Sequence, residues 1–153
     1  MVLAFDYGRT YLVMGERIDK AMQIAQDFVF SGSNVMCISR MHPDLIGERW
    51  AGKKVDTIWL SERPGERNVP PDQLQSLVHR VLTFANGNKR AIIIIDGIEY
   101  LALFNDFHRL QMFFEQLNDI AMESGSILLV ALDPRLFDLR SMARLRRFAE
   151  VVN

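Results

Sequence analysis

Four charged side chains come just after predicted strands and could together form a small polar site. They are Asp96, Arg40, Asp133 and Arg135. Carboxyl ends of parallel strands meet at one edge of a sheet, where open α/β folds bind their ligands. Two carboxylates and two guanidinium groups could hold a small polar ligand there. They could instead form ion pairs that join the loops. A lone carboxylate at a strand end such as Asp96 also often caps a helix or anchors a loop.

The other residues capable of chemistry form no recognisable catalytic arrangement. His42, His79 and His108 lack metal-ligand spacing. Ser39 and Ser61 end predicted strands, but neither lies in a Gly-x-Ser-x-Gly turn. We therefore predict no metal site, no cofactor, no catalytic residue and no enzymatic activity.

Basic residues concentrate between residues 135 and 147. They are Arg135, Arg140, Arg144, Arg146 and Arg147. Such a group could contact an anion or a nucleic acid, or it could be a solvated helix face. The net charge of −1 and the lack of interleaved aromatic residues favour the solvated face, so we do not expect nucleic-acid binding.

Asn105 is predicted to cap the N-terminus of a helix that carries more large apolar residues than one face can bury. The stripe that would cover the sheet is Phe107, Leu110, Phe114, Leu117 and Ala121. Met112 and Phe113 point elsewhere, since successive helical residues are about 100° apart. Phe107, Met112 and Phe113 are therefore predicted to contact a partner protein or a second copy in a homodimer. Alternatively, the C-terminal helix covers this surface through Leu145 and Phe148.

The element that positions these residues is the run Ala91–Asp96. Four consecutive isoleucines favour a strand buried on both faces, as found in the middle of a parallel sheet. Four further strands are predicted: Tyr11–Met14, Val35–Ser39, Thr57–Leu60 and Ile127–Leu132, with a brief edge strand conceivable at Glu150–Val152. Helical patterns separate them. The prediction is a three-layer α/β sandwich whose mostly parallel, five-stranded sheet carries helices on both faces.

Composition indicates one globular domain over residues 1–153. Hydrophobic residues make up 49% and charged residues 24%, which is ordinary for a chain that buries a core. Cys37 is the single cysteine, so an internal disulfide is impossible and a reduced, buried thiol is expected. Asp6, Arg9 and Glu16 interrupt any leader-like segment, and no apolar run reaches membrane-spanning length. These features predict a cytoplasmic protein without membrane association.

Several short motifs resemble, in order, the archaeal family called domain of unknown function 835. They are Tyr11–Val13, Ile38–Arg40 with Pro43, Ile58–Ser61, Val69–Pro71 with Leu74, Asp96–Leu101, Asn105–Phe107 and Asp133–Pro134. The resemblance spans nearly the whole chain. It implies no established activity.

The order of elements also resembles the RecA/KaiC-type ATPase core, in which a strand ending in Asp supplies the magnesium-side carboxylate. Ala91–Asp96 is similar to that strand, but the phosphate loop is missing. Counted from Gly15, its Lys would fall on Ala21 and its hydroxyl on Met22. The resemblance implies Ile127–Leu132 between the first strand and Ala91–Asp96, Val35–Ser39 on the other side of Ala91–Asp96, and Thr57–Leu60 at the outer edge.

Three functions are compatible with these patterns. The first is a non-enzymatic protein-interaction or signalling module on a degenerate ATPase-like fold. The second is a small-ligand or residual nucleotide-binding domain that uses the strand-end pocket of Asp96, Arg40 and Asp133. The third is contact with an anion or nucleic acid through the C-terminal arginines.

Overall fold

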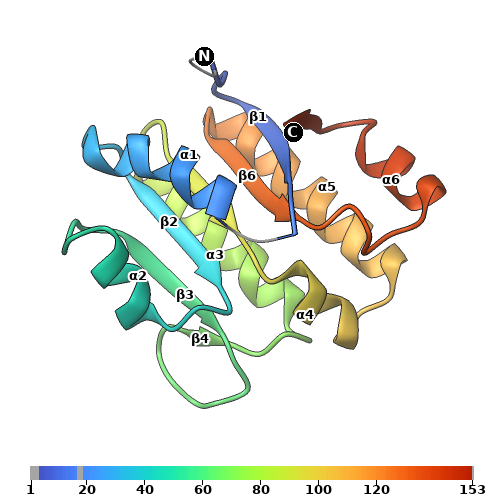
Figure 1. Ribbon diagram of the computed structural model, residues 1–153, viewed down its shortest axis with the longest axis horizontal. Coiled ribbons are helices and arrows are strands. Elements are labelled where there is room, and N and C mark those ends of the chain that lie inside the picture. The colour runs from blue at the N-terminus through green and yellow to red at the C-terminus, as the bar shows by residue number, and fades with distance from the viewer. Residues whose placement is uncertain (1–3, 17–18, 153) are drawn as a thin grey trace.

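The computed structural model describes residues 4–16 and 19–152, which form alternating strands and helices (Figure 1). The strands are β1 (Arg9–Met14), β2 (Val35–Ser39), β3 (Asp56–Leu60), β4 (Asn68–Val69), β5 (Ile92–Ile95), β6 (Ile127–Leu132) and β7 (Glu150–Val152). The helices are α1 (Asp19–Phe30), α2 (Pro43–Arg49), α3 (Leu74–Gly87), α4 (Ile98–Phe104), α5 (Phe107–Ser124) and α6 (Leu139–Leu145).

The strands form one parallel sheet in the order β4-β3-β2-β5-β6-β1-β7. As predicted, β6 lies between β5 and β1, and β2 lies on the other side of β5. The prediction of five strands was wrong, because the sheet has seven, and β3 is not the outer edge. The two-residue β4 follows an irregular loop and is too short to give a periodic signal.

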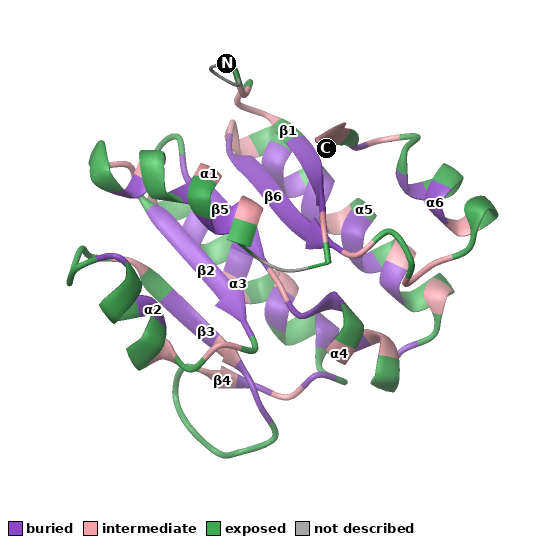
Figure 2. Ribbon diagram, in the orientation of Figure 1, coloured by how far each residue is buried: buried purple, intermediate pink, exposed green. Residues whose placement is uncertain are grey.

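Apolar residues on the two faces of the sheet form two separate cores. One face packs against α1 and α2 through residues that include Tyr11, Cys37 and Ile94. The other face packs against α3, α4, α5 and α6, and it includes Ile93. Buried residues fill the sheet and the inner faces of the helices, whereas the outer faces are exposed (Figure 2). The predicted three-layer α/β architecture is confirmed.

Strand β5 is buried on both faces because its neighbours β2 and β6 complete its hydrogen bonding and helices cover both sides. None of its four isoleucines is more than 1% exposed. Fully burying an aliphatic side chain of this size contributes about 1.5–3 kcal/mol. The central strand is therefore a major source of stability, and it fixes the place of Asp96 at its carboxyl end.

The turn between α4 and α5 differs from the sequence prediction. Asp106, not Asn105, caps α5, and its carboxylate accepts a hydrogen bond from the Arg109 N–H at 2.9 Å. Asn105 is buried instead, and its Nδ2 donates to the carbonyls of Pro71 and Leu101. The short helix α4 had no separate signal because it continues directly from the strand-end motif. Asn105 therefore joins α4 to the loop before α3.

Phe113 is not available to a partner, which corrects the prediction for the α5 surface. Phe113 and Phe114 are both 2% exposed, with ring centroids 5.6 Å apart. Helix α5 buries a wide surface because it packs against the sheet, α3 and α6. Phe107 is partly buried beside Phe137, at a centroid distance of 5.0 Å, whereas Met112 is 50% exposed. Only Met112 of the three remains as an exposed apolar side chain.

None of the described helices combines the length and the apolar character needed to cross a membrane. Cys37 is fully buried between the sheet and α1, and burial raises the pKa of its thiol far above the ordinary value. The carboxylate of Asp96 adds a smaller effect in the same direction. A thiol with such a raised pKa is unreactive at neutral pH.

Candidate functional site

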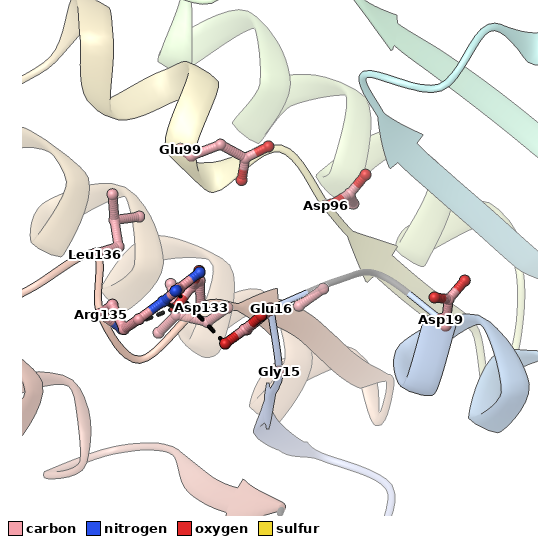
Figure 3. A pocket seen from close by; sticks show the side chains of 10 residues that line it. Gly15, Glu16, Asp19, Asp96, Glu99, Asp133, Arg135 and Leu136 are labelled. Carbon is pink, nitrogen blue, oxygen red and sulfur yellow. Dashed lines mark hydrogen bonds and ion pairs between the residues drawn. The ribbon is translucent and has the colours of Figure 1, made fainter.

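An open cleft of about 800 Å³ lies at the carboxyl ends of β1, β5 and β6 (Figure 3). We call it the carboxyl-edge cleft. Its lining consists of Gly15, Glu16, Asp19, Asp96, Glu99, Ala131, Leu132, Asp133, Arg135 and Leu136. The loop after β1, the start of α1, the first turn of α4 and the loop after β6 thus all contribute. Three of the four predicted site residues line this cleft: Asp96, Asp133 and Arg135.

Asp96 is held in a partly buried position at the end of β5. Its Oδ2 accepts a hydrogen bond from Ser39 Oγ at 2.9 Å, and Ser39 Oγ accepts one from the Met41 N–H at 2.8 Å. Burial raises the pKa of Asp96, hydrogen bonds from Ser39 and the Gly97 backbone lower it, and nearby Glu99 raises it further; the net shift is upward. Asp96 is therefore better suited to a neutral or positively charged neighbour than to an anion.

Asp133 and Arg135 form a local ion pair across the turn after β6. Arg135 Nη2 lies 2.8 Å from Asp133 Oδ2, and Arg135 Nη1 lies 3.5 Å from Glu16 Oε1. The Arg135 side chain and backbone N–H hydrogen bond to Asp133 and lower the pKa of its carboxyl group. The single described guanidinium in the cleft thus already has two carboxylate partners.

Arg40 does not join this group, although it follows the neighbouring strand β2. Its guanidinium carbon lies 4.0 Å from the Tyr100 ring centroid, and Nη1 donates to the Leu60 carbonyl. Gly97 adopts φ +84°, and a Cβ there would lie 3.1 Å from the Arg40 Cγ. Arg40 is thus held against Tyr100 and Leu60 and does not line the cleft. The predicted pocket of Asp96, Arg40 and Asp133 is therefore only partly formed.

The residues that sequence analysis did not assign to this site are Glu16, Asp19 and Glu99. Together with Asp96 and Asp133 they make five carboxylates facing one guanidinium in the described lining. Glu16 and Asp19 follow the first strand, so the rule that selected Asp96 could also have selected them. Glu99 could be found only once α4 was recognised, because its first turn brings Glu99 back over the cleft.

The described lining does not fit a triphosphate. Ala21 and Met22, where a phosphate loop would place its Lys and hydroxyl, are 1% and 0% exposed and pack in the α1 core. Glu16 and Asp19 supply negative charge at the start of α1, where a phosphate would need positive potential. Residues 17 and 18 of this loop lie outside the described residues.

Among residues 4–16 and 19–152, no group of three or more His, Cys, Asp or Glu side chains is arranged to hold a metal ion. His42 instead accepts a hydrogen bond from the Asp44 N–H at the start of α2. Its ring packs edge-on against Trp59, with centroids 4.8 Å apart. The surroundings of His42 are those of a helix cap.

Residues 14–148 match the family described as Protein of unknown function (DUF835). The chain belongs to the DUF835 family. The match covers most of the chain, from the end of β1 to the segment after α6, and it agrees with the resemblance carried by the short sequence motifs. No curated protein matches this DUF835 chain.

Among solved structures, the DUF835 chain is similar to a KaiC-like protein from the hyperthermophilic archaeon Pyrococcus horikoshii. The TM-score is 0.60 at 16% sequence identity, over 83% of this chain. The matched region spans 63% of that protein's length. At this level of identity the likeness establishes a shared RecA/KaiC-like fold and carries no information about activity.

Proposed function

We propose that this DUF835 domain is a non-enzymatic protein-interaction module, used in cytoplasmic signalling, that keeps an ATPase-like fold without its nucleotide chemistry. The observation that carries the proposal is the burial of Ala21 and Met22 beneath an acidic cleft. A phosphoryl-transfer site needs cations and a metal ligand around the transferred group. Here the corresponding positions stabilise the core, so the fold is free to act as a scaffold for binding.

Exposed apolar side chains on the helices support a role in protein contacts. Leu103 and Phe104 of α4 are 78% and 40% exposed, and Met112 of α5 is half exposed. Scattered exposed apolar residues are normal, but several on adjoining helices give a partner surface to bury. A homodimer through Met112 stays a prediction. Sedimentation of wild type and Met112→Glu at micromolar concentration tests it, and a wild-type monomer would rule it out.

The proposal is tested by nucleotide binding and hydrolysis. We expect Mg²⁺–ATP and Mg²⁺–ADP to leave the melting temperature unchanged, because a ligand that binds only the folded state must raise it. We also expect phosphate release to equal that of a buffer blank. Turnover above the blank that is lost in Asp96→Asn would overturn the proposal, because it would give Asp96 the magnesium-side role.

A second candidate function is binding of a small cationic ligand in the carboxyl-edge cleft. Three of the five lining carboxylates already pair with a guanidinium group, Glu16 and Asp133 with Arg135 and Asp19 with Arg49. The remaining two, Asp96 and Glu99, favour an ammonium group over a phosphate. A thermal-shift screen should therefore find stabilisation by diamines and none by matched dicarboxylates. Loss of the diamine effect in Glu16→Gln/Glu99→Gln would locate binding in the cleft. An equal effect in this double variant would exclude the cleft.

A further inference from the structure

A second hollow, of about 340 Å³, shares the loop between β6 and α6 with the carboxyl-edge cleft. We call it the α6 groove. Pro134, Phe137, Leu139, Met142, Ala143, Arg146 and Arg147 line it. Neighbouring residues of the loop are divided between the hollows: Asp133, Arg135 and Leu136 line the cleft, whereas Pro134 and Phe137 line the groove. The groove has no lining residue in common with the cleft.

The groove exposes some apolar side chains outside the core, although Met142 in its lining is buried in the core and Phe137 packs against it. Leu139 is 90% exposed, and Ala143, one helical turn later, is also exposed. Leu145, by contrast, lies on another side of α6 and is fully buried in the core. Phe137 is half-buried and packs edge-on against Phe107. Helix α6 therefore has one apolar face that stabilises the domain and a second that borders the groove.

Positive charge surrounds this apolar floor. Arg146 and Arg147 line the groove, and Arg140 and Arg144 lie on the same segment, all exposed. Within the described part of the chain, none of these four arginines has a carboxylate within salt-bridge distance; Arg135, by contrast, pairs with Asp133 and Glu16. The two acidic residues nearest in the sequence are otherwise engaged: Asp138 caps α6 by accepting from the Ser141 N–H at 2.7 Å, and Glu150 pairs with Arg9. The groove is thus apolar inside and cationic at its rim.

We propose that the α6 groove binds an acidic peptide segment of a partner protein, with an apolar side chain against Leu139 and Phe137. The inference rests on the proposed interaction function and names the site and the chemistry of the partner. Carboxylates of the partner would meet Arg146 and Arg147. Burial of the apolar side chain supplies most of the affinity, and complementary charge supplies orientation and association rate.

Other occupants fit the groove less well. A nucleic acid would need several aromatic faces for base stacking, but Phe137 is the single aromatic residue in the described lining of the groove. A net charge of −1 provides no general attraction for a polyanion. A second copy of this chain presents its clustered carboxylates inside the carboxyl-edge cleft, and two concave surfaces cannot interdigitate. A protruding acidic segment with an apolar residue could contact both the apolar lining of the groove and the arginines at its rim.

The test is fluorescence anisotropy with a labelled peptide that places leucines among glutamates. We expect saturable binding to the wild type and binding weaker by about tenfold or more with Leu139→Glu, Leu139→Gln or Arg146→Glu/Arg147→Glu. The matched control is Lys53→Glu/Lys54→Glu. It makes the same change in net charge at two adjacent exposed residues elsewhere and should stay within about twofold of the wild type. Thermal unfolding of every variant establishes that each is folded.

Four outcomes would overturn the proposal. The first two are no binding by the wild type and equal binding of a peptide with glutamine in place of leucine. The others are an equal loss of affinity in the lysine control, and stronger binding of single-stranded DNA or anionic phosphatidylserine vesicles than of the peptide at the same sites. Each of them leaves the proposed interaction function standing. ATP turnover measured on the same preparations decides that function separately.

Discussion

The two hollows that share the β6–α6 loop are opposite in character. The carboxyl-edge cleft is acidic, and its described guanidinium is already paired with two carboxylates. The α6 groove is apolar with arginines at its rim. The cleft lies where open α/β folds bind ligands, yet the features that favour a partner, exposed apolar surface and unpaired charge, lie in the groove. In this domain, the strand-end position where such folds bind ligands and the hollow with exposed apolar surface are therefore different places.

The largest expected effect comes from placing a lysine where a phosphate loop would have one. Ala21→Lys should destabilise the fold by about 5 kcal/mol, because the side chain enters the α1 core as an unpaired charge. Chemical denaturation measures the change. Gln23→Lys, on the exposed side of the same helix, is the control and should have almost no effect. Full stability of Ala21→Lys together with ATP binding would contradict this expectation and show that the cleft can accept a phosphate.

A second comparison separates the inner and outer faces of α6. Leu145→Ala should cost about 3 kcal/mol, since Leu145 is fully buried in the larger core. Leu139→Ala should change the free energy of unfolding by less than about 0.5 kcal/mol while it weakens peptide binding. Both values come from urea denaturation. A large loss of stability in Leu139→Ala would mean that the groove belongs to the core and is not a binding surface.

Asp96→Asn should stabilise the domain at neutral pH. Burial raises the pKa of Asp96 above its unfolded value, so the folded state binds the proton more tightly. The free energy of unfolding therefore falls as the pH rises from the ordinary aspartate range through the raised pKa. We expect the variant to have a higher melting temperature than the wild type at pH 7. The gain should vanish below pH 4, and a gain independent of pH would contradict the explanation.

The smallest effect is expected for Asp133→Asn. The carboxyl group of Asp133 pairs with Arg135 in an exposed turn, where solvent and salt screen the interaction. The melting temperature should remain within experimental error of the wild type, and peptide binding in the α6 groove should not change. A clear loss of peptide affinity would show that the conformation of the shared loop depends on this ion pair.

The fold was predictable because the strong signals in the sequence are those of the central elements. The four isoleucines of β5 indicate a buried strand, and the spacing of apolar residues in α5 indicates a helix with a buried face. At the ends of the sheet, the brief edge strand conceived at Glu150–Val152 is present as β7, whereas the two-residue β4 was not predicted. Pairing with β3 determines β4, and no local pattern encodes that pairing.

The candidate site was predictable only in part. The rule for strand ends correctly brought Asp96, Asp133 and Arg135 to one cleft. It misplaced Arg40, whose direction depends on contacts with Tyr100 and Leu60 that are distant in sequence. For Phe113 the partner contact was the wrong choice, and the alternative of cover by the C-terminal helix is supported: α3, α6 and the sheet all contact α5, and Leu145 shares a core with Phe113. Side-chain direction depends on tertiary packing, which spacing along the chain does not contain.

A ribosome releases β1 first, yet β1 has no partner until the last strands emerge. Its two neighbours are β6 and β7, more than 110 residues later in the chain. Contacts of such large sequence separation form slowly, because the intervening chain must be ordered before they stabilise anything. Leu12 and Val13 therefore lack both neighbouring strands during most of synthesis, and the sheet is expected to close only after translation has passed Val152. Folding of this domain is a late event, and the time before closure is when the nascent chain most needs protection from aggregation.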